Sequence, residues 1–235
     1  MTGTGTEVGK TVVAAVLART LASEGKRVAV FKPAVTGLDD YPDSGADGPK
    51  SALCQRFSAH RPRGGLAPDH VVLREAAGSR QGDGDIAPYR YGPPMSPHLA
   101  AALAGEEIDP GRLREGARAA ADGADALVCE GVGGLLVPLA PGYCVRDFAV
   151  DLGLPLVVVA SPGLGTINHT LLTIEAARAA ELVVELIVLN PWPDSPNQIE
   201  ESNRETIAAL AGIPVETLPR IDLDDPPSWP RLALS

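Results

Sequence analysis

The chain has 235 residues, 45% of them hydrophobic, enough to bury one substantial core. Its formal net charge of −10 argues against a nucleic-acid partner or an anionic membrane. Its apolar runs are too short to span a bilayer, and no signal peptide is visible. Cys54, Cys129 and Cys144 show no CxxC spacing, so we expect a reducing, cytoplasmic environment rather than a disulfide or zinc framework.

Segments with the periodicity of helices alternate with continuous apolar runs along the chain. We expect helices within residues 10–27, 68–78, 96–107, 109–123, 166–181 and 195–212, and buried strands within residues 27–33, 124–130, 154–161, 182–190 and 213–219. This alternation is typical of a parallel sheet covered on both faces. The sequence therefore predicts an α/β fold with a single doubly wound, mostly parallel sheet in one domain, residues 1–235. Residues 40–67, rich in Asp, Gly, Pro and Ser, are interpreted as a loop insertion with local helix near residues 51–57.

The stretch "GTGTEVGKT", residues 3–11, leads into the first expected helix. Its glycines allow backbone N–H groups to approach a phosphate, Lys10 can reach the β- and γ-phosphates, and the Thr11 hydroxyl can ligate Mg²⁺. Five residues separate Gly3 from Gly9, one more than in the usual phosphate-binding loop (P-loop). The motif predicts a nucleotide site of the P-loop NTPase type without specifying the reaction.

Only Met1 and Thr2 precede this loop, although a phosphate loop normally follows a buried strand. We therefore expect the first strand to be missing before the P-loop. Loss of a central strand would leave a groove in the core and expose the edges of its neighbours. We interpret the short start as missing upstream residues rather than as a degenerate protein.

Three charged residues stand where loops should gather at the carboxyl edge of the sheet. Lys32 ends one expected strand, and Glu130 ends another directly before "GVGG". Lys32 could contact a phosphate or carbamate, and Glu130 could hold Mg²⁺. Each is also compatible with an ordinary strand-end residue. Asp69 begins an expected helix, where a metal role and a helix-dipole role are equally plausible.

Six motifs occur in order: "TGTGTEVGKT", "KPAVTG", "PPMSPHLAA", "CEGVGGLLVPL", "PGLGTINHTLLT" and "NRETIAALAGIPV". With them, nearly the whole chain outside residues 40–67 resembles the dethiobiotin synthetases. The resemblance implies an ATP-dependent cyclo-ligase of biotin synthesis that closes a cyclic urea on 7,8-diaminononanoate with CO₂ and Mg²⁺. It implies a carbamate, its phosphorylation by ATP, and attack by the second amine.

The resemblance also implies roles for individual positions. Lys32 and Lys10 would be catalytic. Thr11, Asp69 and Glu130 would bind the metal, with Asp47 as the rival of Asp69. The remaining ATP contacts would be Glu7, Val8, Gly9, Val12, Gly131, Val132, Gly133, Asn190, Pro191, Leu218, Pro219 and Arg220. Substrate contacts would be Thr36, Thr166, Ile167 and Asn168, the last three reaching the active site of the other subunit of a homodimer.

Other classes stay open at this point. A P-loop switch ATPase that binds partners usually has an additional lysine early in the loop, where residues 2–6 here are Thr and Gly. The amide-forming relatives that act on cobyrinate carry a glutaminase domain, for which 235 residues leave little room. A truncated, non-catalytic relative is the remaining alternative.

Overall fold

The computed structural model describes residues 1–40, 67–232 and 234. The strands are β1 (Thr2–Gly3), β2 (Val28–Phe31), β3 (Ala126–Cys129), β4 (Pro138–Ala140), β5 (Tyr143–Cys144), β6 (Leu156–Ala160), β7 (Val184–Trp192) and β8 (Val215–Pro219). The helices are α1 (Lys10–Ser23), α3 (Asp69–Ala77), α4 (Asp83–Ile86), α5 (Pro97–Leu103), α6 (Pro110–Ala121), α7 (Val145–Leu152), α8 (Thr166–Arg178) and α9 (Gln198–Ala211), with short 3₁₀ turns at Leu38–Asp40 and Pro226–Ser228.

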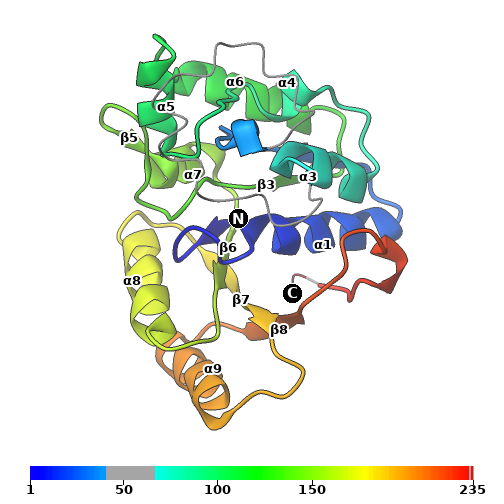
Figure 1. Ribbon diagram of the computed structural model, residues 1–235, viewed down its shortest axis with the longest axis vertical. Helices are drawn as coiled ribbons and strands as arrows, with labels where there is room; N and C mark the ends of the chain where they lie inside the picture. The colour runs from blue at the N-terminus through cyan, green and yellow to red at the C-terminus, as the bar shows by residue number, and fades with distance from the viewer. Residues whose placement is uncertain (41–66, 233, 235) are drawn as a thin grey trace.

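The strands form a parallel α/β architecture, as the sequence predicts (Figure 1). One section has the order β1-β6-β7-β8, a second pairs β2 with β3, and both are parallel throughout. β4 and β5 form a separate antiparallel hairpin. The register Phe31↔Cys129 aligns the carboxyl ends of β2 and β3, and this alignment brings the residues that follow both strands to one edge.

Side chains alternate between two covered faces, which explains why the strands read as continuous apolar runs. On β6, Val157 and Val159 pack in the core cluster that contains α1, whereas Val158 packs with Ile174 of α8 and Ile207 of α9. Around β2 and β3, a further cluster joins these strands to α5, α6 and α7. Both faces of the sheet are therefore buried.

Local signals set several helix ends. The Asp109 side chain accepts a hydrogen bond from Gly111 N at the start of α6, and Asn197 accepts bonds from Ile199 N and Glu200 N at the start of α9. Gly212 ends α9 in the left-handed conformation, with φ 64°. These residue types account for helix boundaries close to the expected ones.

The structure confirms the expected helices and strands and adds shorter elements to them. α4, α7, β4 and β5 were not expected from the sequence. The first helix ends at Ser23, directly before the turn at Gly25, whose φ of 83° suits the helix end that glycine predicts there. The helix expected near residues 51–57, and Asp47, lie outside the described residues.

The outer edge of β2 is covered by a side chain instead of a strand. Gln81 accepts a hydrogen bond from Val30 N at 2.9 Å and donates one to Val30 O at 3.1 Å. One residue further along, Lys32 N donates to Ile86 O at 2.8 Å. The backbone groups that an additional strand would need at Val30 are thus already paired.

Candidate active site

The loop between β1 and α1 has the backbone of an anion-binding turn. Glu7 and Gly9 both adopt left-handed conformations, with φ 62° and 83°. A Cβ atom at position 9 would lie 1.9 Å from Asn190 Nδ2, so only glycine fits there. Asn190 in turn donates to Val8 O at 3.1 Å. Asn190, near the end of β7, therefore holds the loop in place through its hydrogen bond to Val8.

Lys10 is the first residue of α1 and is buried, with 7% of its surface exposed. Its Nζ donates to Gly5 O at 2.7 Å, so the lysine folds back over the loop. Burial lowers the pKa of Lys10, and the nearby Lys32 ammonium lowers it further against the opposing Glu130 carboxylate. The first turn of α1 contains no acidic residue, which leaves its positive end available to an anion.

Lys32 and Glu130 meet at the carboxyl edge of β2 and β3. Lys32 Nζ lies 2.7 Å from Glu130 Oε1 and 2.8 Å from Asp69 Oδ2. Thr11 Oγ1 donates to the same Glu130 Oε1 at 2.9 Å. Four residues from four separate segments thereby form one polar cluster next to Lys10.

Burial and the opposing charges together set the pKa values of Lys32, Glu130 and Asp69 in this cluster. Burial alone would lower the pKa of Lys32, but the Asp69 and Glu130 carboxylates outweigh it and hold the pKa raised. Burial raises the pKa of Glu130, against the opposing effect of Lys32. Burial would also raise the pKa of Asp69, yet Lys32 more than offsets it and the pKa is lowered. Lys32 is the cation that makes two carboxylates tolerable here.

The strand ends β7 and β8 form the edge expected to hold the base of ATP. Asn190 is buried at 4% exposure, and Trp192 pairs with Pro219 across these two strands. Pro191 and Arg220 are exposed at the same edge, whereas the Leu218 side chain belongs to the core cluster around α1. Any contact of position 218 with a nucleotide would therefore come from its backbone.

Thr166, Ile167 and Asn168 are the first residues of α8, which follows Gly165 with φ 90°. Thr166 is buried and its Oγ1 lies 3.5 Å from Thr170 Oγ1, while Asn168 is exposed. Among the described residues, no hydrogen bond or ion pair joins this helix start to the Lys32 cluster. Nor do the described contacts bring Thr36, half-buried after β2, into the cluster.

Comparisons with known proteins place this arrangement in a family. A family model described as an AAA domain matches residues 1–224. The ATP-dependent dethiobiotin synthetase of Bacillus subtilis strain 168 is 33% identical over 223 residues, covering 92% of this chain and 83% of the relative. The chain belongs to the dethiobiotin synthetase family. The ATP-dependent dethiobiotin synthetase of Rhodococcus erythropolis is 38% identical over 219 residues, covering 92% of this chain and 84% of the relative. That of Anaeromyxobacter dehalogenans is 42% identical over 210 residues, covering 89% of this chain and 83% of the relative.

This family member has side chains that fit a magnesium ion. Glu130 Oε2 is buried and has no hydrogen-bond partner among the described residues, and the Asp69 side chain keeps 37% of its surface exposed. The described ranges contain no group of three or more His, Cys, Asp or Glu that could hold a metal. Two carboxylates with a hydroxyl match Mg²⁺, which completes its shell with waters and phosphate oxygens.

Sequence reasoning missed one buried polar residue, Asn203, that holds the loop before α8. Asn203 of α9 donates to Pro162 O at 2.9 Å and to Gly163 O at 3.1 Å, in the loop that leads into α8. It shares a buried face with Ile207 and Ala211, at a spacing of four residues. A buried amide on an otherwise apolar helix face needs hydrogen-bond partners. The asparagine at position 203 of this face was therefore the sequence signal for a contact with another segment.

No helix in the described part of the chain is both long and apolar enough to cross a membrane.

Proposed function

We propose that this protein is an ATP-dependent dethiobiotin synthetase that converts 7,8-diaminononanoate, CO₂ and ATP into dethiobiotin, ADP and phosphate. The observation that carries the proposal is the Lys32 ammonium held between Glu130 and Asp69, next to the phosphate-loop residues Lys10 and Thr11. Family membership with relatives named for this activity supports the same reaction.

The reaction divides into three bond exchanges. One substrate amine attacks CO₂, forms a C–N bond and loses a proton, which gives a carbamate. A carbamate oxygen attacks the γ-phosphorus of ATP as the bond to the ADP oxygen breaks. The second amine then attacks the carbamoyl carbon, phosphate leaves with the C–O bond electrons, and the amine loses its proton. Every step gathers negative charge on oxygens, so positioned cations are the main requirement.

Lys10 and Lys32 would supply those cations. Lys10 covers the loop and would move from Gly5 O to the phosphate oxygens of ATP. Lys32 would neutralise the carbamate and the transferred phosphoryl group, and its raised pKa keeps it charged at neutral pH. Burial of both ammonium groups strengthens their effect, because little water screens them.

Thr11, Asp69 and Glu130 would hold Mg²⁺, which when bound neutralises phosphate charge and orients ATP. The backbone from Glu7 to Val12 would surround the phosphates, with residues 131–133 beside them. Gly133 has φ 63°, and a Cβ at Gly131 would lie 2.9 Å from Val145 Cγ1, so both positions favour glycine.

The proposal extends to the remaining site residues. Asn190, Pro191 and residues 218–220 would border the adenine, and Thr36 would contact the diamine. The start of α8 would bind the substrate carboxylate across a homodimer interface. Two exposed leucines on that segment, Leu164 (93%) and Leu172 (55%), support burial against a second copy. A cytoplasmic location fits the free thiols of Cys129 and Cys144.

A product assay tests this function. The protein is mixed with 7,8-diaminononanoate, Mg²⁺-ATP and bicarbonate, and dethiobiotin is measured by mass spectrometry. Product is expected only when every component is present. Lys26→Ala, which changes an exposed lysine paired with Glu24, serves as the matched control for variants of Lys32. ATP binding without any product would instead identify a non-catalytic relative.

A further inference from the structure

Lys32 and Asp69, which form the 2.8 Å ion pair of the candidate active site, are held by two different helices. Asp69 is the first residue of α3. The backbone of Lys32 is bonded to α4, because Lys32 N donates to Ile86 O at 2.8 Å. α4 follows α3 in the chain, and the two helices contact each other. The contact between α3 and α4 therefore influences how far the Asp69 carboxylate lies from Lys32.

Asp83, the first residue of α4, makes polar contacts with α3. Its Oδ1 forms a hydrogen-bonded ion pair with Arg74 Nη1. Its Oδ2 lies 3.9 Å from Nε2 of His70, a buried residue with 4% of its surface exposed. His70 lies in the first turn of α3, directly after Asp69, and Arg74 lies in the last turn. One carboxylate of α4 therefore contacts both ends of α3.

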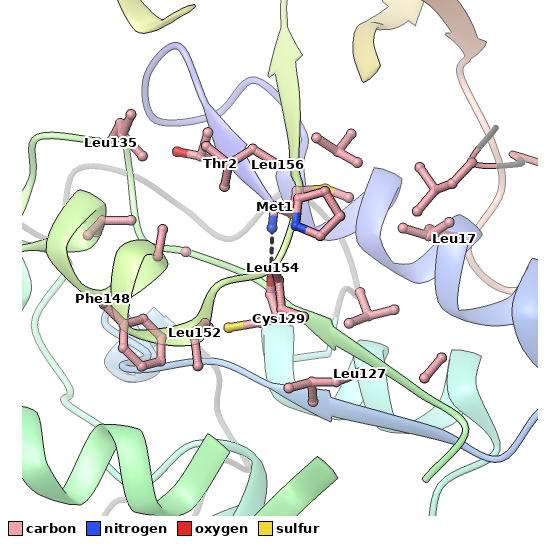
Figure 2. A pocket seen from close by; sticks show the side chains of 18 of the residues that line it. Met1, Thr2, Leu17, Leu127, Cys129, Leu135, Phe148, Leu152, Leu154 and Leu156 are labelled. Atoms are coloured by element: carbon pink, nitrogen blue, oxygen red, sulfur yellow. Dashed lines mark hydrogen bonds between the residues drawn. The ribbon is translucent and has the colours of Figure 1, made fainter. Parts of the chain in front are cut away.

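The remaining support of α3 is apolar. α3 lies against α1, where its Leu73 and Ala77 belong to the same core cluster as α1 (Figure 1). Leu17 of α1 also lines an apolar cavity of about 240 Å³, shown in Figure 2. Apolar contacts are non-directional, so they hold α3 on α1 without defining its position along or about its own axis. A shift of α3 by about 1 Å would lengthen the contact between Asp69 and Lys32 beyond hydrogen-bonding distance.

The ion pair between Arg74 and Asp83 supplies a directional contact. The two side chains keep 31% and 45% of their surfaces exposed. Ion pairs with this exposure contribute little to the stability of a fold, because water and salt screen them. The pair is thus suited to setting the position of α3 on α4 rather than to stabilising the protein as a whole.

We propose that Asp83 is a positioning residue for the active site, which acts through Arg74 and His70 to fix α3 so that the Asp69 carboxylate reaches Lys32. The inference rests on the proposed function where it concerns Mg²⁺, because Asp69 is a proposed ligand of that ion. The contact between Asp69 and Lys32 itself can be measured without ATP or substrate. Asp83 acts on the metal site only through Asp69.

The test compares Asp83→Ala with Asp151→Ala in the full chain. Asp151 of α7 forms an ion pair of 3.2 Å with Arg114 of α6, and these side chains have similar exposures of 31% and 39%. Asp69→Asn, alone and combined with Asp83→Ala, shows whether Asp83 acts through Asp69. We expect Asp83→Ala and Asp151→Ala each to change the melting temperature by at most about 3 °C.

Two readouts follow the position of Asp69. The first is the exchange of the Lys32 ammonium hydrogens with water, measured by nitrogen-15 NMR on the protein alone. We expect Asp83→Ala to speed this exchange by about tenfold, as Asp69→Asn should, because one of the two carboxylate contacts of Lys32 is weakened. The second is the dissociation constant of Mg²⁺-ATP from calorimetry, which Asp83→Ala should raise by about tenfold, with little change for ATP without the metal. Asp151→Ala should leave both readouts unchanged.

In the double variant, both readouts should equal those of Asp69→Asn alone, because Asp83 acts through Asp69. Unchanged exchange at Lys32 in Asp83→Ala would overturn the proposal, and so would a further effect of Asp83→Ala on top of Asp69→Asn. If Asp69→Asn leaves the affinity for Mg²⁺-ATP unchanged, the metal role of Asp69 in the proposed function is wrong. The exchange at Lys32 then still decides whether Asp83 positions Asp69.

Discussion

Lys32 and Glu130 share a hydrogen-bonded ion pair of 2.7 Å, with only 3% and 1% of their surfaces exposed. Asp69 binds the same ammonium at 2.8 Å, so the lysine is both the proposed catalytic cation and the neutralising partner of two acids. Removing it has separable consequences for activity and for stability.

Replacing Lys32 by methionine keeps most of the side-chain volume and removes the charge. We expect turnover to fall by at least about 1000-fold, because a positioned charge on the reacting oxygens is lost. We also expect a loss of about 3–5 kcal/mol of unfolding free energy, because Glu130 is left buried without a cation. The measurements are dethiobiotin production and urea unfolding. In the double variant Lys32→Met with Glu130→Gln, stability should recover and activity should not; recovery of both would remove Lys32 from the mechanism.

Thr11→Val removes the hydroxyl that donates to Glu130 Oε1 and is proposed to bind Mg²⁺. We expect the dissociation constant of Mg²⁺-ATP to rise by about 10–100-fold, with a smaller effect on ATP measured without the metal. Isothermal titration calorimetry with and without Mg²⁺ separates the two. Thr206→Val, on the distant helix α9, is the matched control and should bind normally. Equal weakening with and without Mg²⁺ would contradict a metal role for Thr11.

Gly9→Ala should abolish detectable ATP binding, since the new Cβ would lie 1.9 Å from Asn190 Nδ2. Gly25→Ala is a close control: its φ is also 83°, but nothing lies within 4 Å of its Cβ position. Both variants should lose about 1–2 kcal/mol of stability from left-handed backbone strain, and Gly9→Ala should lose more because of its clash with Asn190. Only Gly9→Ala should lose nucleotide binding in a fluorescence assay. Similar binding by the two variants would show that the contact between loop and β7 is unimportant.

Asn203→Ala should weaken binding of the diamine, although we do not expect Asn203 to contact the diamine directly. Loss of the bonds to Pro162 O and Gly163 O frees the loop before α8, so we expect the KM for 7,8-diaminononanoate to rise about tenfold while kcat and ATP binding change little. Asn197→Ala removes a cap of the same helix, at a comparable cost of about 1 kcal/mol, without reaching that loop. If both variants raise the KM equally, the role of Asn203 is purely structural.

Much of the polar cluster could be anticipated because parallel strands end at one edge. Lys32 and Glu130 each follow a strand in the sequence, and the register Phe31↔Cys129 brings them together. The helix that begins at Asp69 was also expected, and its packing against α1 and β2 brings that carboxylate to Lys32. The family, too, was confirmed from its motifs.

The rest depended on contacts between segments far apart in the chain. The bond from Asn190 to Val8 spans 182 positions and the one from Asn203 to Pro162 spans 41, and no local pattern encodes either pairing. α7 was missed because its eight residues form barely two turns, directly after a short hairpin. Its main local signals are the Asp147 carboxylate, which accepts from Cys144 N, and Gly153 in the left-handed conformation at its end.

The side-chain amide of Gln81 is expected to limit aggregation of the protein at high concentration. A bare outer strand would recruit the same strand from a second molecule and begin ribbon-like polymer growth. Because Gln81 pairs with both backbone groups of Val30, it prevents another strand from pairing with the outer edge of β2 at this residue. Gln81→Ala should therefore show its effect as turbidity at high concentration, while dilute samples remain clear.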